Sequence, residues 1–80
     1  MNEQQRITVY TSGPQCVDCN TVKRWLGEHG YTYIERNIRT EPDALEQLQQ
    51  LGYSSVPVTV VGDAVIDGLD MRALQGALGR

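Results

Sequence analysis

Apolar residues recur along this chain with two different periods, which predict its strands and helices. Stretches rich in β-branched and aromatic side chains favour strands, whereas apolar residues three and four apart favour helices. We expect strands at residues 6–11, 31–38, 56–61 and 64–66. Helices should begin at about residues 16, 41 and 68, and the first two should end at Gly30 and Gly52.

Each expected helix presents apolar residues on the side that would face the core. In the first helix Val22 and Leu26 lie four residues apart, and Cys19 lies one turn earlier on the same side. The expected core face of the second helix consists of Leu45, Leu48 and Leu51. In the last helix the expected core residues are Leu69, Ala73, Leu74 and Leu78.

The order of these elements, βαβαββα, predicts an α/β fold with a four-stranded mixed sheet and three helices. The first βαβ unit requires parallel strands joined by a right-handed crossover. The tight-turn pair Gly62-Asp63 joins the last two strands as an antiparallel hairpin. We expect residues 1–80 to form a single domain, because a chain of 80 residues is near the lower limit for a self-sufficient hydrophobic core.

Composition and charge exclude several classes of function. The formal net charge is −3 and no basic stripe with interleaved aromatic residues occurs, so we expect no nucleic-acid partner. Residues 1–6 are polar and lack the apolar core of a signal peptide, and no apolar stretch approaches the length of a membrane span. We therefore expect a cytoplasmic protein without a membrane partner.

The candidate chemistry lies in the stretch Cys16-Val17-Asp18-Cys19, which holds the only two cysteines of the chain. A strand, a C-x-x-C pair and a helix in this order are typical of a redox dithiol. A one-chain zinc site needs about four ligands, whereas this chain offers one cysteine pair and His29. A purely structural disulfide would usually close a longer loop. Redox exchange is therefore favoured over both alternatives, and we expect no metal site.

The chain resembles the thioredoxin superfamily, and within it the glutaredoxin-sized members. The residues that carry this resemblance are Cys16-Val17-Asp18-Cys19, Lys23, Val56-Pro57, Gly68 and Asp70. The resemblance implies a thioredoxin-like, glutaredoxin-type fold over about residues 6–79. It also implies that the Val56-Pro57 peptide bond is cis and that Pro57 faces the dithiol.

Among the small members, the chain is most similar to NrdH-type redoxins, with matches at Ile7-Thr8-Val9-Tyr10-Thr11, the Cys-Val-x-Cys core and Leu51-Gly52-Tyr53. This resemblance implies a dithiol–disulfide oxidoreductase without a bound cofactor, and we expect it to be a monomer. It would receive electrons from NADPH through thioredoxin reductase and pass them to ribonucleotide reductase or other protein disulfides. Ordinary glutaredoxins carry Cys-Pro-Tyr-Cys and a Gly-Gly pair, where this chain has Val17-Asp18 and Asp67-Gly68.

Two alternatives stay open. The pattern of Gly68 and Asp70 also fits glutaredoxins that use glutathione, although the negative charge of Asp67 would disfavour a glutathione carboxylate there. In a protein of another class, two chains would pool the thiolates of Cys16 and Cys19 around zinc or an iron–sulfur cluster. The reductant that restores the dithiol separates the first alternative from the NrdH-like function.

The positions of the two thiols predict different roles. Cys16, at the helix N-terminus, should be the attacking thiolate, because N–H donors and the helix dipole lower its pKa. Cys19 lies further inside and should resolve the mixed disulfide. The carboxylate of Asp18 should raise the pKa of Cys16 and make the couple more reducing, and Lys23 either partly offsets this effect or is a solvated surface lysine.

Overall fold

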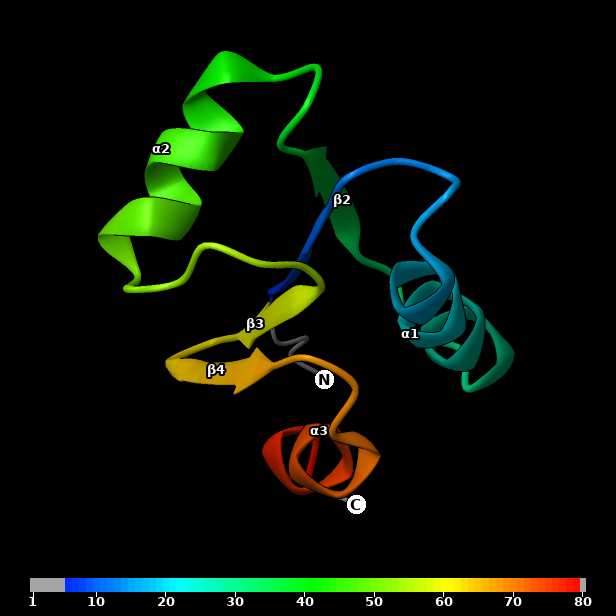
Figure 1. The fold of residues 1–80 in the computed structure, drawn as a ribbon. Coiled ribbons are helices and arrows are strands. Elements are labelled where there is room, and N and C mark those ends of the chain that lie inside the picture. The colour runs from blue at the N-terminus through cyan, green and yellow to red at the C-terminus, as the bar shows by residue number, and fades with distance from the viewer. Residues whose placement is uncertain (1–5, 80) are drawn as a thin grey trace.

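A computed structural model describes residues 6–79 of the chain, and its elements follow the expected order (Figure 1). Two expectations, the lack of a signal peptide and a domain that starts at residue 1, concern residues outside this described part. The elements are β1 (Ile7–Thr11), α1 (Val17–Glu28), β2 (Ile34–Asn37), α2 (Pro42–Gln50), β3 (Val58–Val61), β4 (Ala64–Asp67) and α3 (Met71–Ala77).

The four strands form one mixed sheet in the order β2-β1-β3-β4. Strands β1 and β2 are parallel, whereas β1 with β3 and β3 with β4 are antiparallel. The predicted α/β fold with a four-stranded mixed sheet and three helices is therefore confirmed. Three strands are shorter than predicted: β1 begins at Ile7, β2 spans only Ile34–Asn37, and β3 begins after Pro57. Strand β4 extends one residue further than predicted, to Asp67.

Helices cover both faces of the sheet (Figure 1). Alternation along β1 sends Val9 to one face and Tyr10 to the other, as expected for a strand buried on both sides. The Val9 face packs against Val22 and Leu26 of α1 and against Leu74 of α3. The Tyr10 face packs against α2. Among the described residues, none of the three helices is long and apolar enough to cross a membrane.

The predicted core face of α2 is wrong in part. Ala44 and Leu48, which lie four residues apart, are fully buried against the sheet, whereas Leu45 and Leu51 are 38% and 39% exposed. Leu51 is the C-cap residue and lies beyond the last full turn of α2. A small side chain at Ala44 lets the helix approach the sheet closely, and this contact sets the rotation of the helix about its axis.

The predicted core face of α3 needs a similar correction. Leu74 is buried and Leu78 packs against the core, as expected, but Leu69 is 44% exposed and Ala73 is also exposed. Leu69 precedes the helix, which begins at Met71 after its N-cap Asp70. A side chain before the N-cap does not follow the helical period, so it does not share the face of Leu74.

Two glycines end the first two helices as predicted. Gly30 has φ +80° and Gly52 has φ +93°, a left-handed conformation that side-chain-bearing residues rarely adopt. The next backbone N–H groups then close the helix ends, from Tyr31 to the carbonyl oxygen of Leu26 at 2.9 Å and from Tyr53 to that of Leu48 at 3.2 Å.

The corrected face of α2 yields a first prediction. Leu48→Ala should lower the free energy of unfolding by about 2–5 kcal/mol, because it opens a cavity in the core. Leu45→Ala is the matched control with the same chemical change and helix propensity, and it should cost less than about 1 kcal/mol. Urea denaturation of both variants measures the difference. Equal losses would contradict the assignment of the buried face.

Candidate active site

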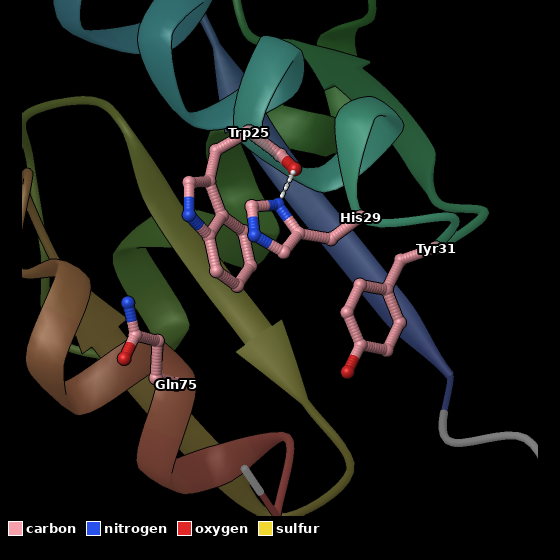
Figure 2. Close-up of a pocket in the computed structure, with 4 residues that line it drawn as sticks. All are labelled: Trp25, His29, Tyr31 and Gln75. Carbon is pink, nitrogen blue, oxygen red and sulfur yellow. Dashed lines mark hydrogen bonds between the residues drawn. The ribbon is translucent and has the colours of Figure 1, made fainter.

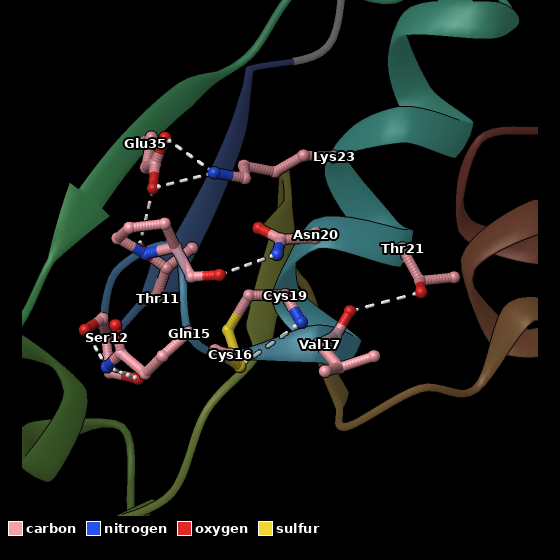
Figure 3. Close-up of a disulfide and its surroundings, with 11 residues drawn as sticks. Thr11, Ser12, Gln15, Cys16, Val17, Cys19, Asn20, Thr21, Lys23 and Glu35 are labelled. Carbon is pink, nitrogen blue, oxygen red and sulfur yellow. Dashed lines mark hydrogen bonds and ion pairs between the residues drawn. A yellow bond between two sulfur atoms is a disulfide. The ribbon is translucent and has the colours of Figure 1, made fainter.

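Cys16 and Cys19 form a disulfide at the start of α1 (Figure 3), with 5.2 Å between their Cα atoms. The loop that leads from β1 to this helix is held by two hydrogen bonds. The Cys16 backbone N–H donates to the carbonyl oxygen of Gly13 at 3.1 Å, and the Asn20 amide donates to that of Pro14 at 2.9 Å. The predicted sequence of strand, C-x-x-C pair and helix is therefore confirmed.

The two sulfur atoms have unequal surroundings. Cys16 is the N-cap residue of α1 and is half-buried, whereas Cys19 is 0% exposed. The Cys19 backbone N–H donates a hydrogen bond to Cys16 Sγ at 3.2 Å. Such a donor at a helix N-terminus stabilises negative charge on the sulfur once the disulfide is reduced. Cys16 is thus the sulfur atom that a partner can approach.

Two further parts of the family resemblance, Val56-Pro57 and Gly68, lie beside the end of β1. The Val56-Pro57 peptide bond is cis, as the resemblance predicts. Because Tyr10 pairs with Val58, Pro57 lies beside the end of β1, where the chain leaves for the cysteine loop. The Gly68 backbone N–H donates to the carbonyl oxygen of Pro57 at 2.9 Å, which brings the end of β4 to the same edge.

Two acidic candidates have plain structural surroundings. Asp70 is the N-cap of α3, and its Oδ1 atom accepts a hydrogen bond from the Ala73 backbone N–H at 3.1 Å. Asp18 lies in the first turn of α1 with an exposed side chain, where the helix dipole favours a carboxylate. Its predicted effect on the Cys16 thiolate stays a prediction.

Lys23 pairs with a carboxylate on the neighbouring strand, and its predicted effect on the Cys16 thiolate stays a prediction. Its Nζ atom lies 3.2 Å from Glu35 Oε1 and 3.1 Å from Oε2 (Figure 3). Glu35 Oε2 also accepts a hydrogen bond from Thr11 Oγ1 at 2.8 Å. No local sequence pattern singles out Glu35 and Thr11, since only the parallel register of β1 and β2, which pairs Val9 with Glu35, brings them together.

The surroundings of Glu35 act on its acidity in opposite directions. Partial burial raises the pKa of the carboxyl, whereas the hydrogen bonds from Thr11 and Lys23 and the charge of Lys23 lower it. The lowering effects win, so the pKa of Glu35 lies below its ordinary value of 4.5. The carboxylate is therefore charged at neutral pH and able to hold the ammonium group.

The only histidine lies far from the dithiol. His29 caps the C-terminus of α1, about 20 Å along the helix axis from Cys16. Its ring stacks on Trp25 with 4.0 Å between centroids, and its Nδ1 atom lies 2.9 Å from the Trp25 carbonyl oxygen. Across residues 6–79 no group of three or more His, Cys, Asp and Glu side chains could hold a metal ion.

A shallow pocket of about 360 Å³ lies at this far end of α1 (Figure 2). Trp25, His29 and Tyr31 form its aromatic side, and Gln75 reaches toward them from α3. The residues that line this pocket do not include either cysteine.

Comparison with known proteins supplies the family. The Glutaredoxin family model matches residues 7–66, which is most of the chain. The chain belongs to the glutaredoxin family. The glutaredoxin-like protein NrdH of Lactococcus lactis subsp. cremoris is 34% identical over 62 residues, which cover 78% of this chain and 85% of that protein.

Two solved structures are similar to this glutaredoxin-family chain in both fold and sequence. NrdH-redoxin from Escherichia coli has 34% sequence identity and a TM-score of 0.74, covering 81% of this chain and 84% of that one. The thioredoxin-like protein BC3987 has 30% identity and a TM-score of 0.85, covering 91% of this chain and 100% of that one. The protein is therefore a thiol–disulfide oxidoreductase, and Cys16 and Cys19 are its redox-active pair.

The contacts of Glu35 predict a pH-dependent contribution to stability. Because the folded-state pKa of Glu35 is lowered, this contribution is present above the unfolded-state value near 4.5 and is lost as the pH falls through the folded-state value. At pH 7 Glu35→Gln should lower the free energy of unfolding by up to about 1 kcal/mol, since the pair is partly exposed to solvent. Urea denaturation at pH 7 and at about pH 3 should show this difference shrink. A difference that stays constant with pH would show that Glu35 stabilises the fold by packing alone.

Proposed function

We propose that this protein is an NrdH-type electron carrier in the cytoplasm. It receives electrons from NADPH through thioredoxin reductase and donates them to ribonucleotide reductase or another protein disulfide. The observation that carries the proposal is the carboxylate of Asp67, which is exposed and stands directly before Gly68 at the dithiol edge of the sheet. Its negative charge repels a glutathione carboxylate, so a protein reductase is the better electron source.

The relatives support the same choice of reductant. NrdH-redoxin from Escherichia coli is a glutaredoxin-like protein with a thioredoxin-like activity profile. This chain shares its fold and about a third of its aligned residues. Val17, which stands between the cysteines, is 73% exposed and offers an apolar contact to a protein partner.

The exchange reaction follows from the unequal surroundings of the two sulfur atoms. The Cys16 thiolate attacks one sulfur of the partner disulfide, a Cys16–partner disulfide forms, and one partner thiolate leaves. The Cys19 thiolate then attacks Cys16 Sγ and releases the second partner thiolate. The partner gains two electrons and two protons in total, and the protein is left with the Cys16–Cys19 disulfide for the reductase to reduce. The 5.2 Å separation of the Cα atoms makes this second step intramolecular and fast.

The placement of Gly68 and Asp70 favours a second candidate function, that of a glutathione-dependent glutaredoxin. Both residues follow β4 at the edge that also holds Pro57. Asp70 nevertheless caps α3, which leaves one of its carboxylate oxygens for a ligand. The measured reductant decides between the two functions.

The burial of Cys19 argues against a cluster shared by two chains. A metal ion or iron–sulfur cluster between chains needs ligands that reach the surface, but Cys19 is 0% exposed. Visible absorption, the zinc and iron content and the oligomeric state of anaerobically purified protein test this alternative. A dimer that holds zinc or a coloured iron–sulfur cluster would favour it over the carrier.

The proposed division of labour between the thiols yields a prediction. Cys19→Ser protein should attack a disulfide protein such as insulin and remain covalently attached, because nothing resolves the intermediate. Cys16→Ser protein should form no such adduct, because its remaining thiol is buried. Intact-protein mass spectrometry counts the adducts. Adducts formed by Cys16→Ser rather than by Cys19→Ser would reverse the two roles.

A coupled assay tests the electron source. The oxidation of NADPH is followed with insulin as acceptor, in one arm with thioredoxin reductase and in the other with glutathione and glutathione reductase. We expect fast turnover in the reductase arm alone. Fast turnover with glutathione alone would make the protein a glutathione-dependent glutaredoxin, and no turnover in either arm would refute both electron sources.

A variant that removes the charge of Asp67 tests whether this charge hinders the reaction with glutathione. Asp67→Asn should raise the rate in the glutathione arm roughly fivefold, because it removes the charge that repels a carboxylate. Asp63→Asn is the matched control, since Asp63 lies in the turn at the opposite end of β4. Equal effects of both variants would show that only the net charge matters.

A further inference from the structure

Lys23 lies on the helix that begins at the dithiol, and its ammonium group is bound by Glu35. Lys23 follows Cys19 by one helical turn, so both side chains leave the same side of α1. Figure 3 shows the lysine reaching across to Glu35 on β2, while the disulfide lies at the start of the helix. An unpaired ammonium at this place would stabilise a thiolate and so the reduced form.

The carboxylate that holds Lys23 is itself fixed in place. Both oxygen atoms of Glu35 lie within hydrogen-bond distance of Lys23 Nζ, at 3.1 and 3.2 Å. Thr11, which donates to Glu35 at 2.8 Å, is 0% exposed and ends the strand that leads to the cysteine loop. The side chains of Lys23 and Glu35 are 21% and 35% exposed, so solvent screens them only in part.

We propose that Glu35 is a positioning residue that binds the Lys23 ammonium and keeps its charge from stabilising the dithiol form. The couple then stays more reducing than the neighbouring lysine alone would make it, which suits an electron donor. This inference rests on the exchange chemistry of the proposed function, but not on the identity of its reductase or acceptor.

The redox equilibrium with dithiothreitol tests the proposal without any protein partner. The reaction is dithiol protein plus oxidised dithiothreitol, giving disulfide protein plus reduced dithiothreitol, so two electrons and two protons pass between them. Glu35→Gln should shift this equilibrium roughly threefold toward the dithiol protein, which corresponds to about 14 mV for a two-electron couple. The thiolate absorbance of Cys16 should then titrate at a lower pH than in the wild type.

The same substitution in a Lys23→Met protein distinguishes a positioning role of Glu35 from a direct effect of its own negative charge on the thiolate. If Glu35 acts by holding Lys23, the logarithmic shift caused by Glu35→Gln should fall to less than about half in a Lys23→Met protein. The same shift in both backgrounds would show that Glu35 acts through its own charge, and this would overturn the proposal. Lys23→Arg keeps the positive charge and the pairing, so it should stay near the wild-type equilibrium.

Asp43→Asn is the matched control for loss of an ion pair. Asp43 lies 2.9 Å from Arg36 on the α2 side of the sheet, so its loss should leave the redox equilibrium unchanged. Urea denaturation confirms that every variant is folded before titration. No shift in Glu35→Gln, or an equal shift in Asp43→Asn, would refute the positioning role. Failure of both arms of the NADPH assay would leave this equilibrium measurable, so the two proposals fail independently.

Discussion

The buried stripe of α1 holds the dithiol in place. Cys19, Val22 and Leu26 are at most 1% exposed, and Val22 and Leu26 pack against the Val9 face of the sheet. Because these residues share one side of the helix, their burial fixes its rotation and leaves Cys16 at the accessible N-terminus. The difference between an approachable and a hidden sulfur therefore follows from the same contacts that build the core.

Strand β2 ties the helices on both sides of the sheet through two neighbouring charged residues. Glu35 projects toward α1 and binds Lys23, whereas Arg36 projects toward α2 and binds Glu41 and Asp43, each at 2.9 Å. Partly exposed ion pairs contribute little to the free energy of unfolding. The role proposed for the Lys23–Glu35 pair is therefore electrostatic, because a charge close to a thiolate changes its pKa directly.

The departures of this chain from ordinary glutaredoxins cluster where a reductant would bind. Val17 and Asp18 occupy the turn between the cysteines, and both are exposed. Asp67 and Gly68 lie at the same edge of the sheet as Pro57. These positions lie outside the buried core, so the same fold can carry different residues around the dithiol.

The sequence by itself determined the order of elements, the mixed sheet, the helix ends at Gly30 and Gly52 and the redox pair. These features depend on local patterns, namely the period of apolar residues, the left-handed preference of glycine and the short spacing of two thiols. The cis bond before Pro57 came from the family resemblance, because the dipeptide alone favours the trans form.

Only the tertiary structure decided which face of α2 is buried and where Lys23 points. Leu45, Leu48 and Leu51 follow a helical spacing as well as Ala44 and Leu48 do, so the choice between them depends on how closely the helix approaches the sheet. Lys23 contacts Glu35 because α1 packs on the Val9 face of the sheet, and the parallel register of β1 and β2 places Glu35 beside Val9. No local pattern encodes that register.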